Sequence, residues 1–188
     1  MSKVEIRNDK EVINFIFKGS PWFPIDNFYP DAVCEFEGLT YENSEAAFQS
    51  AKTLDMSVRK LFTEMSPSQA KFVGKNPAII KLRPDWNEVK FGIMRNIVRS
   101  KMDLNPYCRD MLIKTGDAEI IEGTYWNDRI WGIDLHTGIG DNWLGKILME
   151  LREYYKTIFP EMEEENEYDE EDEDEEEWGE SYDNDDDQ

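Results

Sequence analysis

Histidine is almost missing from this chain. His136 is the only histidine among 188 residues, so a histidine-based catalytic triad and a zinc site built on several histidines are both excluded. Any catalysis must instead use carboxylates, lysines, amides and aromatic rings. We therefore predict no metal site and no cofactor.

Cysteines and long apolar runs are equally scarce. Cys34 and Cys108 lie far apart in the sequence and match no metal-binding or redox spacing. The chain has no hydrophobic signal segment and no run of about 20 apolar residues that could span a membrane. These absences predict a soluble cytoplasmic protein with reduced thiols and no membrane partner.

Positive charge is missing from the end of the chain. The net charge is −21, and residues 161–188 contain 19 Asp or Glu and no Lys or Arg. The first 160 residues are nearly neutral, with 23 acids against 21 bases. An acidic segment with so few apolar residues does not offset the entropy cost of its ordering. We expect one domain over 1–160 and a disordered acidic tail over 161–188 that could bind a basic protein surface.

The composition changes along the chain from β-branched and aromatic residues to helical periodicity. Strands are predicted over 11–17, 32–41 (with a hairpin tip at Glu37-Gly38) and 118–123. Helices are predicted over 44–54, 57–65, 66–74, 85–101, 106–114 and 143–159. Asp85 and Glu88 have capping-box spacing, and Asn142 or Asp141 would cap the last helix. The predicted fold is α+β, a predominantly helical single domain with a small N-terminal β-hairpin or sheet.

Three polar residues share one narrow face of the helix predicted after Ser44. At about 100° per residue, Glu45, Gln49 and Lys52 align on that face, and Ala47, Ala51 and Leu54 are among the residues opposite. Glu45 falls in the first turn, where the helix dipole favours a carboxylate. A carboxylate, an amide and an amine so spaced could hold, protonate and attack a polar substrate. The alternative is an ordinary solvated face.

Aromatic residues and acids alternate in segments that should be loops. They occur at 26–30, at Trp86, at 126–128 and at 131–134. A flat polar ligand such as a nucleobase stacks on aromatic planes while it hydrogen-bonds to the acids. The alternative is that these tryptophans fill the core or its rim.

An ordered set of motifs over about 15–155 resembles the YbiA-like or NADAR (NAD- and ADP-ribose-associated) family. The matching pieces are Phe17-Lys18-Gly19, Asp26-Asn27-Phe28-Tyr29-Pro30, Tyr41, Glu45 to Gln49, Lys52, Trp86, Met94, Lys101, Leu112, Thr115-Gly116-Asp117, Asp128, Trp131-Gly132-Ile133, Gly140 to Gly145, Leu148-Met149 and Leu151-Arg152. One departure is Ile25-Asp26, where the family usually has Leu-Ser. The acidic segment lies outside the resemblance.

The resemblance implies an N-glycosidase that cuts the bond between ribose C1′ and a nitrogen. Implied substrates are phosphorylated ribosylaminopyrimidine intermediates of riboflavin synthesis, or ADP-ribose on guanine in nucleic acid. Family catalysis implies roles for the positions of Glu45, Trp86 and Asp128, with Lys52 and Asn142 in the pocket. The substrate-binding residues expected in the same pocket are Trp86, Asn27, Phe28, Tyr29, Gln49, Trp131, Gly132 and Asn142.

The residue types suit this chemistry in two ways. Glu45 or Asp128 could stabilise the positive charge that develops at C1′, and either could protonate the leaving nitrogen. Alternatively, Lys52 could form a Schiff base with the opened C1′ aldehyde. Trp86 would stack on the base, while Asn27, Asn142 or backbone N–H groups at the starts of the 44–54 and 143–159 helices would hold phosphate.

Two other functions stay open at this point. The domain could bind ADP-ribose or a nucleotide without cutting it, although extra acids in such a pocket favour catalysis. The acidic tail could instead mimic nucleic acid and block a basic partner. Nineteen acids lower the affinity for DNA or RNA, which favours a small or protein-delivered substrate.

Overall fold

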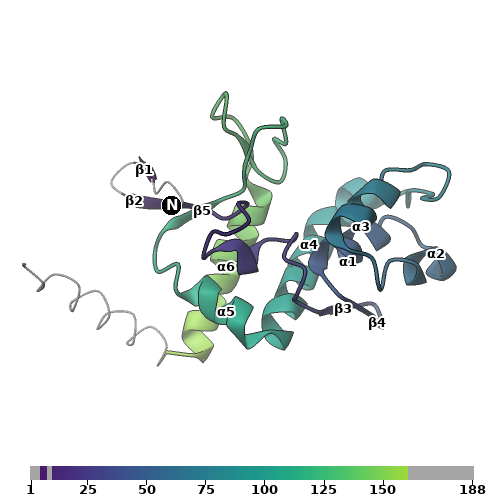
Figure 1. Cartoon of the computed structure of the whole chain (residues 1–188), viewed down its shortest axis with the longest axis horizontal. Helices are drawn as coiled ribbons and strands as arrows, with labels where there is room; N and C mark the ends of the chain where they lie inside the picture. Colours follow the sequence, from purple (N-terminus) through teal and green to yellow (C-terminus); the bar gives the residue numbers. More distant parts are fainter. Residues whose placement is uncertain (1–4, 8–9, 161–188) are drawn as a thin grey trace, which may run out of the picture.

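The structure is a computed structural model that describes residues 5–7 and 10–160 (Figure 1). Its strands are β1 (Glu5–Arg7), β2 (Lys10–Asn14), β3 (Cys34–Phe36), β4 (Leu39–Tyr41), β5 (Glu119–Ile121), β6 (Gly123–Thr124) and β7 (Ile133–Asp134). Its helices are the 3-10 turn η1 (Phe23–Ile25) and α1 (Ser44–Ser50), α2 (Met56–Lys60), α3 (Pro67–Val73), α4 (Trp86–Leu104), α5 (Pro106–Ile113) and α6 (Trp143–Ile158). The predicted α+β, mainly helical fold is confirmed for these residues. The predicted acidic tail lies outside them.

The strands form three small sheets instead of one large sheet. In the first, β1 pairs antiparallel with β2, which pairs parallel with β5, so Ile13 lies beside Ile120. In the second, β3 and β4 form the predicted hairpin, and its tip uses positive φ angles of 46° at Glu37 and 79° at Gly38. In the third, β6 pairs parallel with β7. The predicted strand 118–123 is therefore divided between two sheets, and Glu122 is the dividing residue.

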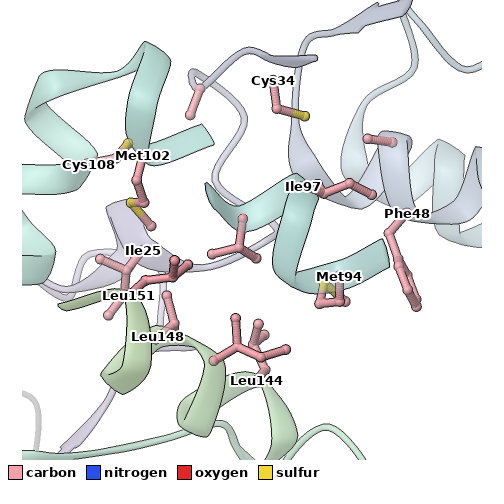
Figure 2. Packing of buried hydrophobic residues seen from close by; sticks show 14 of the residues in the cluster. Ile25, Cys34, Phe48, Met94, Ile97, Met102, Cys108, Leu144, Leu148 and Leu151 are labelled. Carbon is pink, nitrogen blue, oxygen red and sulfur yellow. The ribbon is translucent and has the colours of Figure 1, made fainter. Parts of the chain in front are cut away.

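The core is built around α4 and α6. In Figure 1, α4 lies between the group of α1, α2 and α3 and the group of α5 and α6. Both long helices carry apolar residues at intervals of three or four, which places them on one face. Figure 2 shows how Met94 and Ile97 of α4 pack with Leu144, Leu148 and Leu151 of α6. Burying these side chains is the main stabilising contribution to the fold, at about 1.5–3 kcal/mol for each.

Several local predictions need correction. The helix that begins at Ser44 ends at Ser50 rather than near residue 54, so Leu54 does not continue its apolar face and is 59% exposed. Asp85 does not form a capping box, because its carboxylate accepts hydrogen bonds from Arg83 at 2.7 and 2.9 Å. Asn142 precedes α6 in the left-handed conformation (φ 52°), and its side chain makes no cap.

The two cysteines are buried and form no disulfide. Cys34 lies on β3 and Cys108 on α5, and both belong to the core shown in Figure 2. Burial raises the pKa of the Cys34 thiol to about 12. Both thiols therefore act as small apolar groups in the packing. Within the described residues, no helix is long and apolar enough to cross a membrane.

Candidate active site

A cavity of about 330 Å³ opens where α1, α3, α4 and the start of α6 meet several loops. Its lining comes from segments that are far apart in the sequence: Asp26, Asn27, Phe28, Glu45, Phe48, Gln49, Lys52, Lys71, Lys75, Trp86, Lys90, Met94, Glu122, Trp126, Asp128, Ile130, Trp131 and Leu144. A second hollow of about 470 Å³ adjoins it and shares Asp26, Phe28, Lys71, Lys75, Glu122 and Trp126. We call the first the inner cavity and the second the outer hollow.

The polar face of α1 is buried in the inner cavity, so the solvated-face alternative is wrong. Glu45 is 6% exposed and Gln49 is 5% exposed. Asn43 starts the helix by accepting a 2.9 Å hydrogen bond from the backbone N–H of Ala46. One turn later, Nε2 of Gln49 donates a 2.8 Å hydrogen bond to Oε1 of Glu45. The Glu45 carboxyl group is thus held in a fixed direction.

Burial and charge act against each other at Glu45. Burial raises the pKa of Glu45, while Lys71, the hydrogen bond from Gln49 and Lys52 oppose that rise. Conversely, burial lowers the pKa of Lys52, and the charge of Glu45 opposes it. Nζ of Lys52 donates a 3.2 Å hydrogen bond to the carbonyl oxygen of Gly74. The cavity therefore holds a carboxyl group and an amine whose protonation states respond to one another.

Three aromatic rings form one wall of the inner cavity. Phe48 of α1 packs on Trp86 with ring centroids 5.2 Å apart, and on Trp131 at 5.2 Å and an interplanar angle of 83°. Figure 2 shows Phe48, Met94 and Leu144 at the same end of the core, and all three line the cavity. The aromatic wall is therefore continuous with the core and rigidly supported. Trp86 and Trp131 lie where the sequence predicted a stacking surface.

The loop after η1 brings an acid and an amide to the cavity. Oδ1 of Asp26 accepts a 2.9 Å hydrogen bond from the backbone N–H of Phe28, and the backbone oxygen of Asp26 accepts one at 2.6 Å from the buried ammonium group of Lys101. Burial raises the pKa of Asp26. Nδ2 of Asn27 contacts Sδ of Met94 at 3.2 Å, which leaves Oδ1 of Asn27 buried without a hydrogen-bond partner among the described residues.

Asp128 lines the inner cavity and also shapes its own loop. Its Oδ1 accepts hydrogen bonds from the backbone N–H groups of Ile130 at 3.1 Å and Trp131 at 3.0 Å. These bonds hold Trp131 against Phe48, so the acid and the aromatic wall are positioned together. Asn127, one residue earlier, has a φ of 59°, which lets the chain turn sharply at this point.

Three residues from the predicted site do not line the inner cavity. Tyr29 packs edge-on against Phe23 at 5.6 Å. At Gly132, a Cβ would overlap the carbonyl oxygen of Glu122, so the glycine permits a close backbone approach. Asn142 donates a 2.9 Å hydrogen bond to the carbonyl oxygen of Ile120 and accepts one at 3.1 Å from the N–H of Glu122. Gly132 and Asn142 thus hold the backbone around Glu122 and do not face the cavity.

The structure also brings in charged residues that the predicted site did not include. Lys71 of α3 and Lys75, two residues after that helix ends, line both spaces, and Lys90 of α4 lines the inner cavity. Nζ of Lys71 lies over the rings of Phe28, at 4.7 Å, and Trp126, at 5.6 Å. Nothing in the local spacing of Lys71 and Lys75 indicates a site, and the packing of α3 on α1 brings both lysines to it.

Glu122 is the other residue that the sequence did not indicate. It lines both spaces, and its Oε2 is buried with no hydrogen-bond partner among the described residues. Burial raises the pKa of Glu122 to about 8, with further contributions from Asp26 and Asp128. In the sequence, Glu122 is only the last polar residue of a short strand pattern.

The fold that carries this cavity belongs to a recognised class of domain. Residues 15–156, more than half of the chain, match the NADAR domain, and the chain belongs to the NADAR family. It is 35% identical over 143 residues to the N-glycosidase YbiA of Escherichia coli K12, covering 76% of this chain and 87% of that protein. The solved structure of E. coli YbiA matches with a TM-score of 0.68 and 34% identity, covering 81% of this chain and 88% of the other.

A more distant relative has a different name. The chain is 32% identical over 127 residues to a riboflavin biosynthesis protein of Vibrio vulnificus, in a match that spans 68% of this chain but only 34% of that protein. The matching segment is therefore one part of a longer chain in that relative. The family expected from the sequence motifs is confirmed.

Proposed function

We propose that this protein is an N-glycosidase that hydrolyses the C1′–N bond of a phosphorylated, ribosylated base or amine. The observation that carries the proposal is the buried Glu45 carboxyl group, fixed by Gln49 and facing the same cavity as Lys52 and Asp128. Cleavage of this bond develops positive charge at C1′, which a carboxylate in a poorly hydrated site stabilises strongly. The names of the YbiA relatives support the same reaction class.

In this proposal each wall of the inner cavity has a task. The aromatic wall of Phe48, Trp86 and Trp131 receives the flat base. Glu45 and Asp128 lie toward the ribose, where they stabilise C1′ and direct a water molecule to it. The lysines at the border of the two spaces, Lys71 and Lys75, bind the phosphate groups. This assignment replaces Asn142 as a phosphate ligand, because both ends of its amide are already bonded to the backbone.

Two substrate classes fit this proposal, a ribosylaminopyrimidine phosphate and ADP-ribosylated guanine. The relative named as a riboflavin biosynthesis protein supports the first. The outer hollow next to the inner cavity supports a substrate with more than one anionic group, as in ADP-ribose. Both are therefore assayed.

Lys52 offers a second route to the same products. Its lowered pKa increases the fraction of neutral amine, which could attack the opened C1′ aldehyde. Sodium borohydride added during turnover separates the routes. The carboxylate route predicts no covalent adduct, whereas a ribosyl adduct on Lys52 would assign the reaction to the Schiff base.

A non-catalytic binding module is the competing function. A binding module needs no fixed carboxylate beside C1′. It therefore predicts that Glu45→Gln still binds the substrate, and that neither wild type nor Glu45→Gln releases a base. The enzyme predicts that wild type releases base from one of the two substrates and that Glu45→Gln does not. Glu42→Gln is a matched control, because Glu42 is exposed just before α1 and does not line the cavity.

A further inference from the structure

The backbone around Glu122 is fixed by two hydrogen bonds and by the close packing of Gly132. Its N–H donates to Oδ1 of Asn142 at 3.1 Å, and its carbonyl oxygen accepts from the N–H of Ile133 at 2.8 Å. Gly132 packs directly on that carbonyl group, where a Cβ would not fit. The chain changes sheets at Glu122, and its side chain lines the inner cavity and the outer hollow.

The surroundings of the Glu122 side chain favour a protonated acid. The charged groups that act on it are the carboxylates of Asp26, Asp128 and Glu45 and the ammonium group of Lys71. Three neighbouring carboxyl groups against one ammonium group, around a side chain whose Oε2 is buried, disfavour the ionised form of Glu122. Burial and these carboxylates raise the pKa of Glu122 to about 8, so the group carries a proton at neutral pH.

The three other acids that line the inner cavity, Asp26, Glu45 and Asp128, all accept hydrogen bonds from N–H groups. Oε1 of Glu45 accepts from the Gln49 amide, and Oδ1 of Asp128 accepts from two backbone N–H groups. An N–H donor stabilises the ionised form of a carboxyl group. Glu122 Oε2 has no such donor among the described residues. The sequence left open which of Glu45 and Asp128 protonates the leaving nitrogen. The structure adds Glu122 as a third candidate for that role.

We propose that Glu122 is the proton donor to the leaving nitrogen, while Glu45 and Asp128 act as carboxylates. This inference rests on the proposed N-glycosidase function. A glycosidase needs one group that is protonated and one that is ionised at the same pH, so the environments of the two groups must shift their pKa values apart. Glu122 lines the same inner cavity as Glu45 and the aromatic wall, so its carboxyl group faces the space in which the leaving nitrogen would lie.

The proposed step balances as follows. The electron pair of the C1′–N bond stays on nitrogen, which takes the proton from Glu122, and Glu122 becomes a carboxylate. A water oxygen bonds to C1′ and gives one proton to Glu45 or Asp128. Release of that proton to solvent and uptake of one by Glu122 restore the enzyme, so the net reaction consumes one water molecule.

The test compares wild type with Glu122→Gln, Glu122→Asp and the control Glu119→Gln, assayed on both proposed substrates across pH. Glu119 lies on the same strand, β5, and does not line either space. We expect Glu122→Gln to lower kcat roughly 100-fold or more with little change in KM, as removal of a general acid does. The wild-type decline in activity as pH rises through about 8 should vanish in Glu122→Gln and persist in Glu122→Asp.

Three results would overturn the proposal. If Glu122→Gln keeps its kcat and its alkaline decline while Glu45→Gln is inactive, Glu122 is not the donor, although the glycosidase function stands. If wild type cleaves neither substrate, the proposed function fails and this inference fails with it. A third readout needs no substrate. In protein labelled with ¹³C at the glutamate carboxyl carbons, the NMR signal of Glu122 is identified as the one that is absent from Glu122→Gln. That signal should titrate near pH 8, and titration near the ordinary value of 4.5 would contradict the proposal.

Discussion

The Gln49 amide donates a 2.8 Å hydrogen bond to the Glu45 carboxyl group, one helical turn away and inside the cavity. This bond is one of the interactions that oppose the rise in the Glu45 pKa caused by burial. In the proposed mechanism, Gln49 is a positioning residue that fixes the Glu45 carboxyl group and favours its ionised form. The other end of the same amide, Oε1, is buried without a partner among the described residues.

Gln49→Leu tests this relationship. Without the donor, the Glu45 pKa should rise further, so the acidic limb of the pH–activity profile should move to higher pH. We expect kcat to fall about tenfold at neutral pH, because hydrogen bonds to charged groups contribute about 1.5–3 kcal/mol. An unchanged acidic limb would show that Gln49 does not act through Glu45.

Gly74→Ala perturbs the same pair from the neighbouring helix end. A Cβ at Gly74 would overlap the Gln49 amide, and the Gly74 carbonyl oxygen is the acceptor for Lys52. Because the φ of Gly74 is −63°, alanine adds no backbone strain. Activity should therefore fall, and stability should fall by about 1–3 kcal/mol, because the methyl group overpacks the buried Gln49 amide and the backbone oxygen of Ala70.

Gly92→Ala is the matched control for that substitution. Gly92 lies on the exposed side of α4, and no atom lies within 4 Å of the point that an alanine methyl carbon would occupy there. Alanine should therefore stabilise the helix by about 0.5–1 kcal/mol without changing activity. Equal activity losses in Gly74→Ala and Gly92→Ala would contradict a local effect on Gln49. Thermal unfolding and steady-state kinetics on the three proteins decide the matter.

Stability should depend on pH through Glu122. The pKa of Glu122 is about 8 in the folded protein, against an ordinary value of 4.5 that represents the unfolded chain. Between pH 4.5 and pH 8, the unfolded chain therefore loses a proton that the native protein keeps. The free energy of unfolding should therefore fall as pH rises through this window, by at most about 1.4 kcal/mol per pH unit for one group. Asp26 and Glu45 contribute in the same direction, because burial raises the pKa of both.

Glu122→Gln should remove the Glu122 share of that slope. Chemical denaturation of wild type and Glu122→Gln at several pH values across the window measures the difference directly. Parallel stability curves for the two proteins would mean that Glu122 ionises normally in the native state.

Lys71→Met tests the assignment of the phosphate groups. Lys71 borders both spaces and lies over the rings of Phe28 and Trp126, so its loss removes charge and packing together. We expect KM for a phosphorylated substrate to rise roughly tenfold, about 1.4 kcal/mol, and the difference to shrink at high salt. Lys60→Met on α2 is the control, because Lys60 is exposed and outside the cavity. Equal KM values for the two variants would place the phosphate elsewhere.

The sequence predicted the elements whose information is local. Helical periodicity located α4 and α6, and the Glu37-Gly38 tip located the β3–β4 hairpin, because these patterns depend on residues close in the chain. The prediction failed at Asn142, whose αL conformation and amide hydrogen bonds depend on the chain at and just after β5, about 20 residues earlier. An asparagine before a helix has the same local sequence pattern whether its side chain caps that helix or hydrogen-bonds to a distant strand.

The site shows the same division. Glu45 and Gln49 could be paired from helical spacing alone, and the structure places them together. Lys71 and Glu122 could not be found in this way, because they reach the cavity through the packing of α3 on α1 and the change of sheets after β5. Their roles depend on burial and on neighbours from distant segments, and local spacing carries neither.

Base release by wild type and Glu45→Gln is the most direct test of the central claim. Both proteins are incubated with a ribosylaminopyrimidine phosphate and with an ADP-ribosylated guanine oligonucleotide, and the freed base or amine is measured. The account predicts release by wild type from one of these substrates, normal release by the control Glu42→Gln, and none by Glu45→Gln. Release by Glu45→Gln at the wild-type rate, or no release by wild type, would contradict it.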